Sequence, residues 1–248
     1  MERKNHYIIG DVHGEYQTLL ALVTKLPKDA KLIFVGDLID RGLQSREVVK
    51  FVRDNGHRTV MGNHEVFMIK YGGEFAQYIL ADVDIDINER WIRNGGAETL
   101  LSYGLVEVNQ DGDYKIVKDI EAIEQLKEDI EWMKKLPLYV ELETSHPSGK
   151  KVVVSHSNIS KVWSIRENKE YRELFVSTTL WGRENETSDN VNIFNIYGHT
   201  PQKHGAEIGK DYANIDTGCC FFSSEDKLYG KLSAYCVESG EVIECEKI

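Results

Sequence analysis

The sequence is poor in cysteine, in proline and in long hydrophobic runs. Its four cysteines lie near the C-terminus without C-x-x-C spacing, so neither a structural zinc cage nor a secreted disulfide framework is expected. With only four prolines and 41% hydrophobic residues, the composition is that of a globular chain rather than a disordered one. No apolar run reaches the length of a membrane span, and the run before Gly10 is too short for a signal peptide. We therefore expect a cytoplasmic protein without a membrane partner.

Basic runs are also absent, and the formal net charge is −11. Nucleic-acid binding depends on clustered Lys and Arg that release counterions from the phosphate backbone, so we expect no nucleic-acid partner. The length of 248 residues fits one domain over residues 1–248. The sequence carries no signal for an oligomeric state.

Short apolar runs alternate with amphipathic segments in the first part, which is typical of βαβ units. Strands are predicted over 7–9, 31–35 and 59–61. The first helix has Tyr16, Leu19, Leu20 and Val23 on one face, and the second begins near Ser45 as N-cap, with Val48, Val49 and Val52 facing inward. A helix over 119–136 has a buried stripe made of Ile120, Ile123, Leu126 and Ile130 and stops at Pro137. Further strands are predicted over 138–142, 151–154, 193–197 and 213–215, with a hairpin over 227–237.

Three motifs follow the first three predicted strands: Gly10-Asp11-Val12-His13-Gly14, Gly36-Asp37-Leu38-Ile39-Asp40-Arg41-Gly42 and Gly62-Asn63-His64-Glu65. The carboxyl ends of strands form the usual ligand crevice of α/β sheets, so we expect these loops to meet. Carboxylate, imidazole and amide ligands suit first-row divalent ions, and the lack of thiolate argues against a closed structural zinc site. His156 and His199 end two later strands. There are thus enough ligands for two ions that share Asp37, about 3.5–4 Å apart, with a water of lowered pKa between them.

The combination of D-x-H, G-D-x-x-D-R-G and G-N-H-E, with later S-H and G-H-T-P contexts, resembles the calcineurin-like metallophosphoesterases. Within them it is similar to the phosphoprotein phosphatase branch, in particular to the bacteriophage lambda type and its bacterial relatives. The resemblance extends over Trp91-Ile92-Arg93-Asn94-Gly95-Gly96, Leu136-Pro137-Leu138, Trp181-Gly182-Arg183 and Ile215-Asp216-Thr217-Gly218. One departure is Ser157, because relatives usually carry alanine or glycine after the matching histidine.

The resemblance implies a four-layer αββα fold, in which two mixed β-sheets pack as a sandwich flanked by helices. It implies two divalent metal ions, with Mn²⁺ as the working choice and Fe, Zn, Ni or Co as alternatives. Asp11, His13 and His199 would hold one ion, Asn63 and His156 would hold the other, and Asp37 would bridge them.

Catalytic roles follow from the same resemblance. Arg41 and Arg183, helped by Asn63, would bind the phosphate oxygens, which a guanidinium fork fits well. His64 would protonate the leaving oxygen, and Asp40 would orient its ring. The implied reaction is one-step, in-line attack on phosphorus by a metal-bridging hydroxide.

The leading expectation for function is a serine/threonine protein phosphatase, acting on a phosphorylated protein or a small phosphate ester. The main alternative is hydrolysis of dinucleoside polyphosphates such as diadenosine tetraphosphate, and the lid between Gly72 and Asp119 is the region relevant to that choice. A nuclease is disfavoured because the phosphodiesterase branch usually has aspartate where Glu65 stands and lacks the Asp40-Arg41 pair. A catalytically silent scaffold for a phosphorylated partner is a further alternative, against which the presence of His64, Asp40 and Arg41 speaks.

Overall fold

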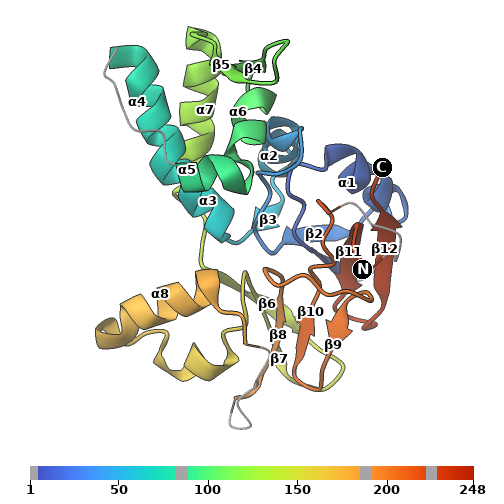
Figure 1. Cartoon of the computed structure of the whole chain (residues 1–248). Coiled ribbons are helices and arrows are strands. Elements are labelled where there is room, and N and C mark those ends of the chain that lie inside the picture. Colours follow the sequence, from blue (N-terminus) through green and yellow to red (C-terminus); the bar gives the residue numbers. More distant parts are fainter. Residues whose placement is uncertain (1–4, 82–88, 185–190, 222–227) are drawn as a thin grey trace.

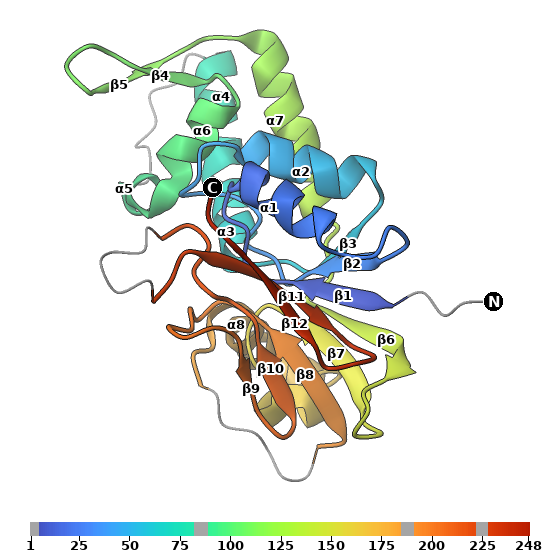
Figure 2. The same ribbon diagram turned by 90° about the vertical axis from the view of Figure 1, so that its right-hand side faces the viewer.

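Two five-stranded sheets pack face to face between helical layers (Figures 1 and 2). The computed structural model describes residues 5–81, 89–184, 191–221 and 228–248. In Figure 1, helices lie above the first sheet, the second sheet lies below the first, and helix α8 lies at the lower left, beside the second sheet. This is the four-layer αββα arrangement that the family resemblance implies.

The first sheet has the order β12-β11-β1-β2-β3. Its parallel part is the predicted βαβαβ unit, made of β1 (His6–Ile9), α1 (Tyr16–Thr24), β2 (Lys31–Phe34), α2 (Ser45–Asp54) and β3 (Arg58–Thr59). On the other side of β1, the antiparallel strands β11 (Lys231–Cys236) and β12 (Val242–Glu246) complete it. The sheet is therefore mixed.

The C-terminal hairpin lies later than predicted. We expected it over 227–237, but residues 231–236 form a single strand whose partner begins at Val242, and Lys227 lies outside the described residues. The chain reverses at Gly240, which has a φ of 74°, a conformation that glycine adopts without steric cost. The prediction was wrong because it placed the turn inside the apolar run of β11.

The second sheet has the order β6-β7-β8-β10-β9 and is also mixed. Four of its strands match predicted ones to within a few residues, namely β6 (Tyr139–Ser145), β7 (Lys151–Ser155), β8 (Ile193–Tyr197) and β10 (Tyr212–Asn214). The unpredicted β9 (Glu207–Ile208) has only two residues. Helix α8 (Arg172–Trp181) and the 3₁₀ turns Ser160–Ile165 and Lys169–Tyr171 accompany this sheet.

Side chains alternate between the layers, as the two-residue period of a strand requires. Val152 and Val154 of β7 join Ile8 of β1 in the core between the sheets. Val153 points the other way and packs with Phe175 of α8. Neighbouring residues of one strand thus hold two different layers together.

Helices α1 and α2 cover the first sheet, and a helical lobe that contains most of the lid region packs beyond them (Figure 2). Its elements are α3 (Asn63–Phe67), a π-helical turn (Met68–Gly72), α4 (Gly73–Ala81), α5 (Glu89–Trp91), a second π-helical turn (Ile92–Gly96), α6 (Ala97–Ser102), the hairpin of β4 (Val106–Val108) and β5 (Tyr114–Ile116), and α7 (Ile120–Met133). Among the described residues, no helix combines the length and the apolar character needed to cross a membrane. The lobe is thus a packed layer of short helices.

Helix α7 follows its predicted pattern with one exception. Asp119 caps it by accepting a hydrogen bond from the backbone N–H of Ala122 at 3.0 Å, and Ile123, Leu126 and Ile130 are buried. Ile120 is 58% exposed, contrary to the prediction, because it lies in the first turn, where the hairpin and α6 do not cover it.

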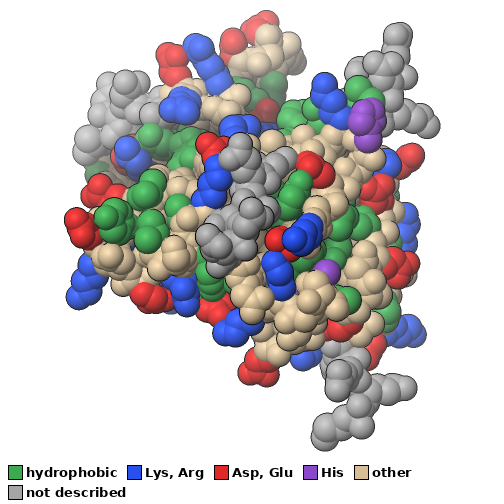
Figure 3. Space-filling view, turned by 90° about the horizontal axis from the view of Figure 1, so that it is seen from below, with side chains coloured by type: hydrophobic (Ala, Val, Ile, Leu, Met, Phe, Trp, Pro, Cys, Tyr) green, Lys and Arg blue, Asp and Glu red, His purple; other side chains and the backbone are tan. Residues whose placement is uncertain are grey.

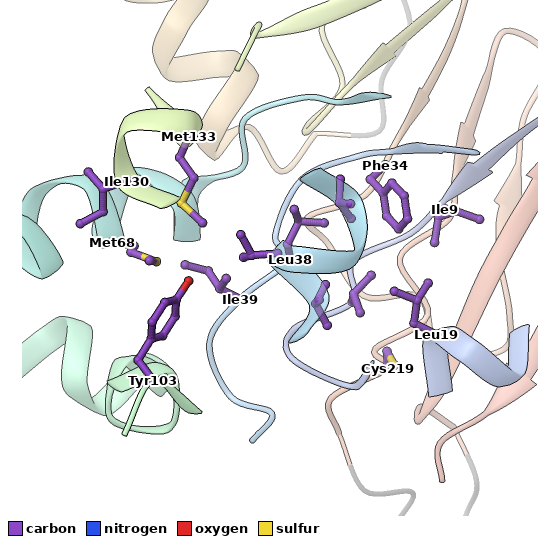
Figure 4. Close-up of a cluster of buried hydrophobic side chains, with 14 of the residues drawn as sticks. Ile9, Leu19, Phe34, Leu38, Ile39, Met68, Tyr103, Ile130, Met133 and Cys219 are labelled. Carbon is purple, nitrogen blue, oxygen red and sulfur yellow. The ribbon is translucent and has the colours of Figure 1, made fainter. Parts of the chain in front are cut away.

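The loop after β2 is anchored by two apolar side chains. Leu38 and Ile39 are fully buried, and Figure 4 shows them between Phe34 and Ile9 on one side and Met68 and Tyr103 on the other. The loop carries Asp37 and Asp40 immediately beside these anchors, so core packing fixes both carboxylates in place.

On the face of the molecule seen from below, Lys and Arg side chains are interspersed with Asp and Glu side chains (Figure 3).

Candidate metal centre

The predicted metal ligands converge at the carboxyl ends of strands from both sheets. They follow β1, β2, β3, β7 and β8, which are far apart in the sequence. All six are at least nine-tenths buried: Asp11, His13, Asp37, Asn63, His156 and His199. The fold therefore withdraws a set of carboxylates, imidazoles and an amide from water, which is unfavourable unless they are paired or coordinate metal.

The backbone is strained at this place. Among the described residues, five other than glycine have a positive φ, and all are predicted site residues: His13, Asp37, Asp40, Arg41 and His199. Such conformations cost on the order of 1–3 kcal/mol each and concentrate at functional sites. The strain turns the side chains of three separate loops toward one point.

Asp37 lies between two imidazoles. Its Oδ2 is 3.5 Å from Nε2 of His13, and its Oδ1 is 3.4 Å from Nε2 of His156. The Nδ1–H of His13 donates to the carbonyl of Ile39 at 2.8 Å, so the lone pair of a neutral ring faces Asp37. The two carboxylate oxygens thus serve two adjacent ligand groups, as a bridging residue requires.

The second ligand group brings acceptor atoms together. His156 donates its Nδ1–H to the carbonyl of Val35 at 2.8 Å, which leaves its Nε2 as an acceptor. That Nε2 lies 2.9 Å from Oδ1 of Asn63 and 3.1 Å from Nδ1 of His199. An imidazole lone pair and an amide oxygen cannot bond to each other, but both can coordinate a cation.

His199 joins a different group from the one we expected. We placed it with Asp11 and His13, but its ring lies beside His156, and only its backbone N–H reaches the Asp11 carboxylate, at 3.1 Å. Gly198 makes this possible, because a Cβ there would collide with Oδ1 of Asp11. The φ of 69° at His199 then directs the ring toward His156.

The electrostatics of the site favour neutral imidazoles. Burial lowers the pKa of His199 to about 3, with further lowering by His156 and Arg183, and burial likewise lowers the pKa of His13 and of His156. The three rings therefore offer lone pairs at neutral pH.

Like charges accumulate at Asp11 and Asp216. Burial raises the pKa of Asp11 well above its usual range, and the neighbouring Asp216 and Asp37 raise it further. Burial also raises the pKa of Asp216 to about 7. Divalent cations would relieve this repulsion. The donor atoms and the charges therefore fit two divalent ions.

Asp40 and His64 form a buried pair. Nδ1 of His64 lies 2.7 Å from Oδ2 of Asp40. Burial alone would lower the pKa of His64, but the carboxylates of Asp37 and Asp40 outweigh it and raise the pKa. The protonated ring is therefore favoured, as the predicted role as a proton donor requires.

Three residues that sequence reasoning missed hold Asp40. Thr99 donates to its Oδ1 at 2.6 Å, and Trp91 donates to its Oδ2 at 3.1 Å. Ser45 accepts from the backbone N–H of Asp40 at 3.1 Å. The motif that contains Trp91 was the only signal for this network.

The prediction that Ser45 is the N-cap of α2 was wrong. Ser45 is the first helical residue, after Gln44, and its hydroxyl is engaged with the loop.

Glu65 is a fourth residue whose role sequence reasoning missed. Its Oε2 accepts from the backbone N–H of Asp37 and of Gly62, and its Oε1 accepts from that of Leu38, at 2.8–2.9 Å. Burial, reinforced by the charge of Asp37, raises the pKa of Glu65 to about 7. The carboxylate ties two site loops together. The three-residue spacing from Gly62 to Glu65 is that of a capping box and was the available signal.

The two predicted arginines are placed differently. Arg41 reaches the site, where its Nη1 donates to Nε2 of His13 at 2.7 Å and its Nη2 lies 3.1 Å from Nε2 of His64. Gly95 abuts its backbone, and a Cβ at Gly95 would collide with the backbone N of Arg41. Arg183 is exposed beyond the C-terminal end of α8 and lines a cavity of about 210 Å³ with Asn158 and Lys161. Arg183 thus lies on the rim of the candidate metal centre and not inside it.

Comparisons with known proteins identify the family of this chain. The model of the calcineurin-like phosphoesterase family matches residues 6–207. A bis(5'-nucleosyl)-tetraphosphatase of the asymmetrical type from Geobacillus sp. is 26% identical over 86% of this chain and 85% of its own length. A symmetrical bis(5'-nucleosyl)-tetraphosphatase from Erwinia tasmaniensis is 26% identical over 82% of this chain, but over only 60% of its own length.

A serine/threonine phosphatase of Saccharomyces cerevisiae has a similar fold, with a TM-score of 0.59 and 14% identity over 99% of this chain and 80% of that one. Fold and site together define a metal-dependent phosphoesterase. The chain belongs to the calcineurin-like phosphoesterase family.

Proposed function

We propose that this chain hydrolyses dinucleoside polyphosphates, with diadenosine tetraphosphate as the representative substrate. The observation that supports this most is the Geobacillus relative, which is 26% identical over 86% of this chain and is named for this activity. It favours our alternative expectation over the serine/threonine protein phosphatase. The products would be two nucleotides.

The six buried donors are the proposed metal ligands. We assign His13 to one ion, Asn63, His156 and His199 to the other, and Asp37 to both, because the distances group these side chains in this way. Asp11 joins His13 in this proposal, as the family resemblance implies. When bound, two divalent ions supply a water of lowered pKa and positive charge for the phosphoryl oxygens. Mn²⁺ is the working choice.

Arg41 and Arg183 are the proposed phosphate-binding residues. The Arg41 guanidinium already lies between the imidazoles of His13 and His64, and its five donors suit the oxygens of a phosphate that enters there. Arg183 would complete the grip from the rim. Asn63 turns its amide oxygen toward His156, which leaves its NH₂ group for a phosphate oxygen.

His64 is the proposed general acid. A hydroxide ion attacks phosphorus and forms one P–O bond while the bond to the leaving phosphate oxygen breaks, and Nε2–H of His64 donates a proton to that oxygen. Asp40 fixes the ring from the opposite nitrogen at 2.7 Å, so Nε2 points into the site. Preorganised donors of this kind stabilise charge that develops in the transition state.

The test is a two-substrate assay on protein whose metal content has been measured. After elemental analysis and addition of Mn²⁺, we expect a higher kcat/KM for diadenosine tetraphosphate than for a phosphoserine peptide. Faster hydrolysis of the peptide would instead make the chain a protein phosphatase. No hydrolysis even of para-nitrophenyl phosphate, with both metals bound, would leave the scaffold as the better explanation.

A further inference from the structure

A cleft leads away from Arg41 into the lid. Its volume is about 640 Å³, and its lining includes Arg41, Arg93, Glu98, Tyr114 and Phe221. This is within the range typical of small-molecule sites, about 300–1,000 Å³. We call it the lid cleft. Arg41 also contacts His13 and His64, so the lid cleft borders the candidate metal centre at this arginine.

A smaller apolar chamber adjoins the lid cleft. That chamber has a volume of about 320 Å³ and shares Arg93 and Tyr114 with the lid cleft, while Leu100, Val106 and Ile116 form apolar walls. The chamber lies under the hairpin of β4 and β5, which projects on the same side as α5 in Figure 2. A ligand held at Arg41 can therefore extend toward an apolar end.

Two aromatic rings in the lid cleft are open to solvent. Tyr114 is 49% exposed and Phe221 is 40% exposed, and the guanidinium carbon of Arg41 lies 5.7 Å from the centroid of the Phe221 ring. Large aromatic side chains left open at a site provide stacking surfaces, and every nucleobase has a flat face for them. Tyr114 lines both spaces, so it stands where the lid cleft meets the chamber.

The charges of the lid cleft match a chain of phosphates that carries a base. Arg93 is a second guanidinium on the same wall as Arg41, and its partner Glu89 is an exposed residue at 2.9 Å. An exposed pair of this kind is weak and can be exchanged for another anion. Glu98, whose Oε1 is 3.4 Å from the hydroxyl of Tyr114, offers an acceptor for an exocyclic amine.

We infer that the lid cleft is the subsite for one nucleoside of the substrate, with the base stacked on Tyr114 and the phosphate chain running past Arg93 to Arg41. This rests on the proposed function. It makes Tyr114 and Arg93 specificity-determining residues, which contact the part of the substrate that does not react. A para-nitrophenyl phosphate molecule is too short to use them.

The experiment compares Tyr114→Ala, Tyr114→Phe and Lys115→Ala with the unaltered chain, in Mn²⁺. For each, kcat/KM is measured on diadenosine tetraphosphate and on para-nitrophenyl phosphate, and the ratio is taken. Lys115 is the matched control, because it is the next residue of β5 and its side chain pairs with Glu107 on the other face of the hairpin. Tyr114→Phe keeps the ring and removes only the hydroxyl.

Tyr114→Ala should lower the ratio about 5- to 100-fold through KM, which is the size of one stacking contact. The ratio for Tyr114→Phe should be close to that of the unaltered chain, and the ratio for Lys115→Ala should be unchanged. An unchanged ratio in Tyr114→Ala, with the unaltered chain active on the dinucleotide, overturns the nucleoside subsite and leaves the proposed function standing. Lack of dinucleotide hydrolysis by the unaltered chain overturns both.

Arg93→Ala provides an independent test of the path of the phosphate chain. It should raise KM more for diadenosine tetraphosphate than for para-nitrophenyl phosphate, because only the long substrate reaches Arg93. An equal effect on both substrates would show that Arg93 acts through the structure of the lid, and it would overturn the proposed path of the phosphate chain.

Discussion

The carboxylate of Asp40 is completely buried and lies 2.7 Å from Nδ1 of His64. Thr99 and Trp91 donate to the same carboxylate, so it cannot turn away from the imidazole. The proton on the far nitrogen of His64 is thereby aimed into the site.

Replacing His64 with Asn should lower kcat about 10²- to 10⁴-fold, or about 3–5 kcal/mol, because the proton donor is lost. The loss should be greatest for substrates with poor leaving groups, which depend most on protonation. A series of phosphate esters with leaving groups of increasing pKa measures this dependence. An unchanged rate on an alkyl phosphate would contradict the assignment.

Glu65→Gln should destabilise the protein by about 1–3 kcal/mol, because its NH₂ group would face a backbone N–H that now donates to the carboxylate. Asp37, the proposed bridging ligand, should shift as a result, and metal content should fall. Urea unfolding and elemental analysis provide the two readouts. Glu128→Gln, on the exposed face of α7, is the control and should leave both unchanged. Normal stability and full metal occupancy in Glu65→Gln would argue against this role.

Gly198→Ala should weaken metal binding about 10- to 100-fold, the usual effect of disturbing a group that orients a ligand. The new Cβ would meet the Asp11 carboxylate and also lie 2.8 Å from Cγ2 of Val35. Titration with Mn²⁺ measures the affinity. The control is Gly73→Ala at the start of α4, where a Cβ meets nothing within 4 Å; it should bind metal normally. Equal affinities in the two variants would refute the steric argument.

His57 should make stability depend on pH. Burial lowers its pKa in the folded protein, where its ring packs 5.2 Å from that of Phe51. Below about pH 6.5 the unfolded chain binds a proton at His57 more readily than the folded chain does. The contribution of neutral His57 to the free energy of unfolding is therefore present above that pH, and it is lost as pH falls through the folded pKa.

Urea unfolding with a chelator at about pH 7.5 and at about pH 5 tests this dependence. His57→Gln should lose less stability between the two pH values than the unaltered chain does. His204→Gln, at an exposed position, should behave like the unaltered chain. The same loss in all three proteins would rule out His57 as the source.

The residues of the candidate site were open to prediction because each motif follows a short apolar run. Asp11, Asp37 and Asn63 stand directly after strand segments, and parallel strands bring their carboxyl ends together. The alternation of Val152, Val153 and Val154 between two cores was likewise implicit in the two-residue period of a strand. Periodicity and local turn signals describe the backbone over a few residues. The strand ends and the alternation of side chains depend only on such short stretches of sequence.

The pairing of Asp40 with Thr99, 59 positions away, could not be predicted in this way. It depends on how α6 packs against the loop after β2, and no local pattern encodes that contact. The hydrogen bonds of Glu65, and the position of Arg183 on the rim, were hidden for the same reason. The C-terminal hairpin was misplaced because an apolar run does not reveal where its partner strand begins.

The sequence by itself determined the chemical types of the ligands, their order along the chain and the layers that carry them, because local periodicity and strand ends are written in neighbouring residues. Only the tertiary structure decided that the His199 ring lies with His156 while its backbone serves Asp11. It also decided that the lid leaves a cleft beside Arg41. Both depend on the packing of segments that are distant in the sequence, and packing is a property of the whole folded chain.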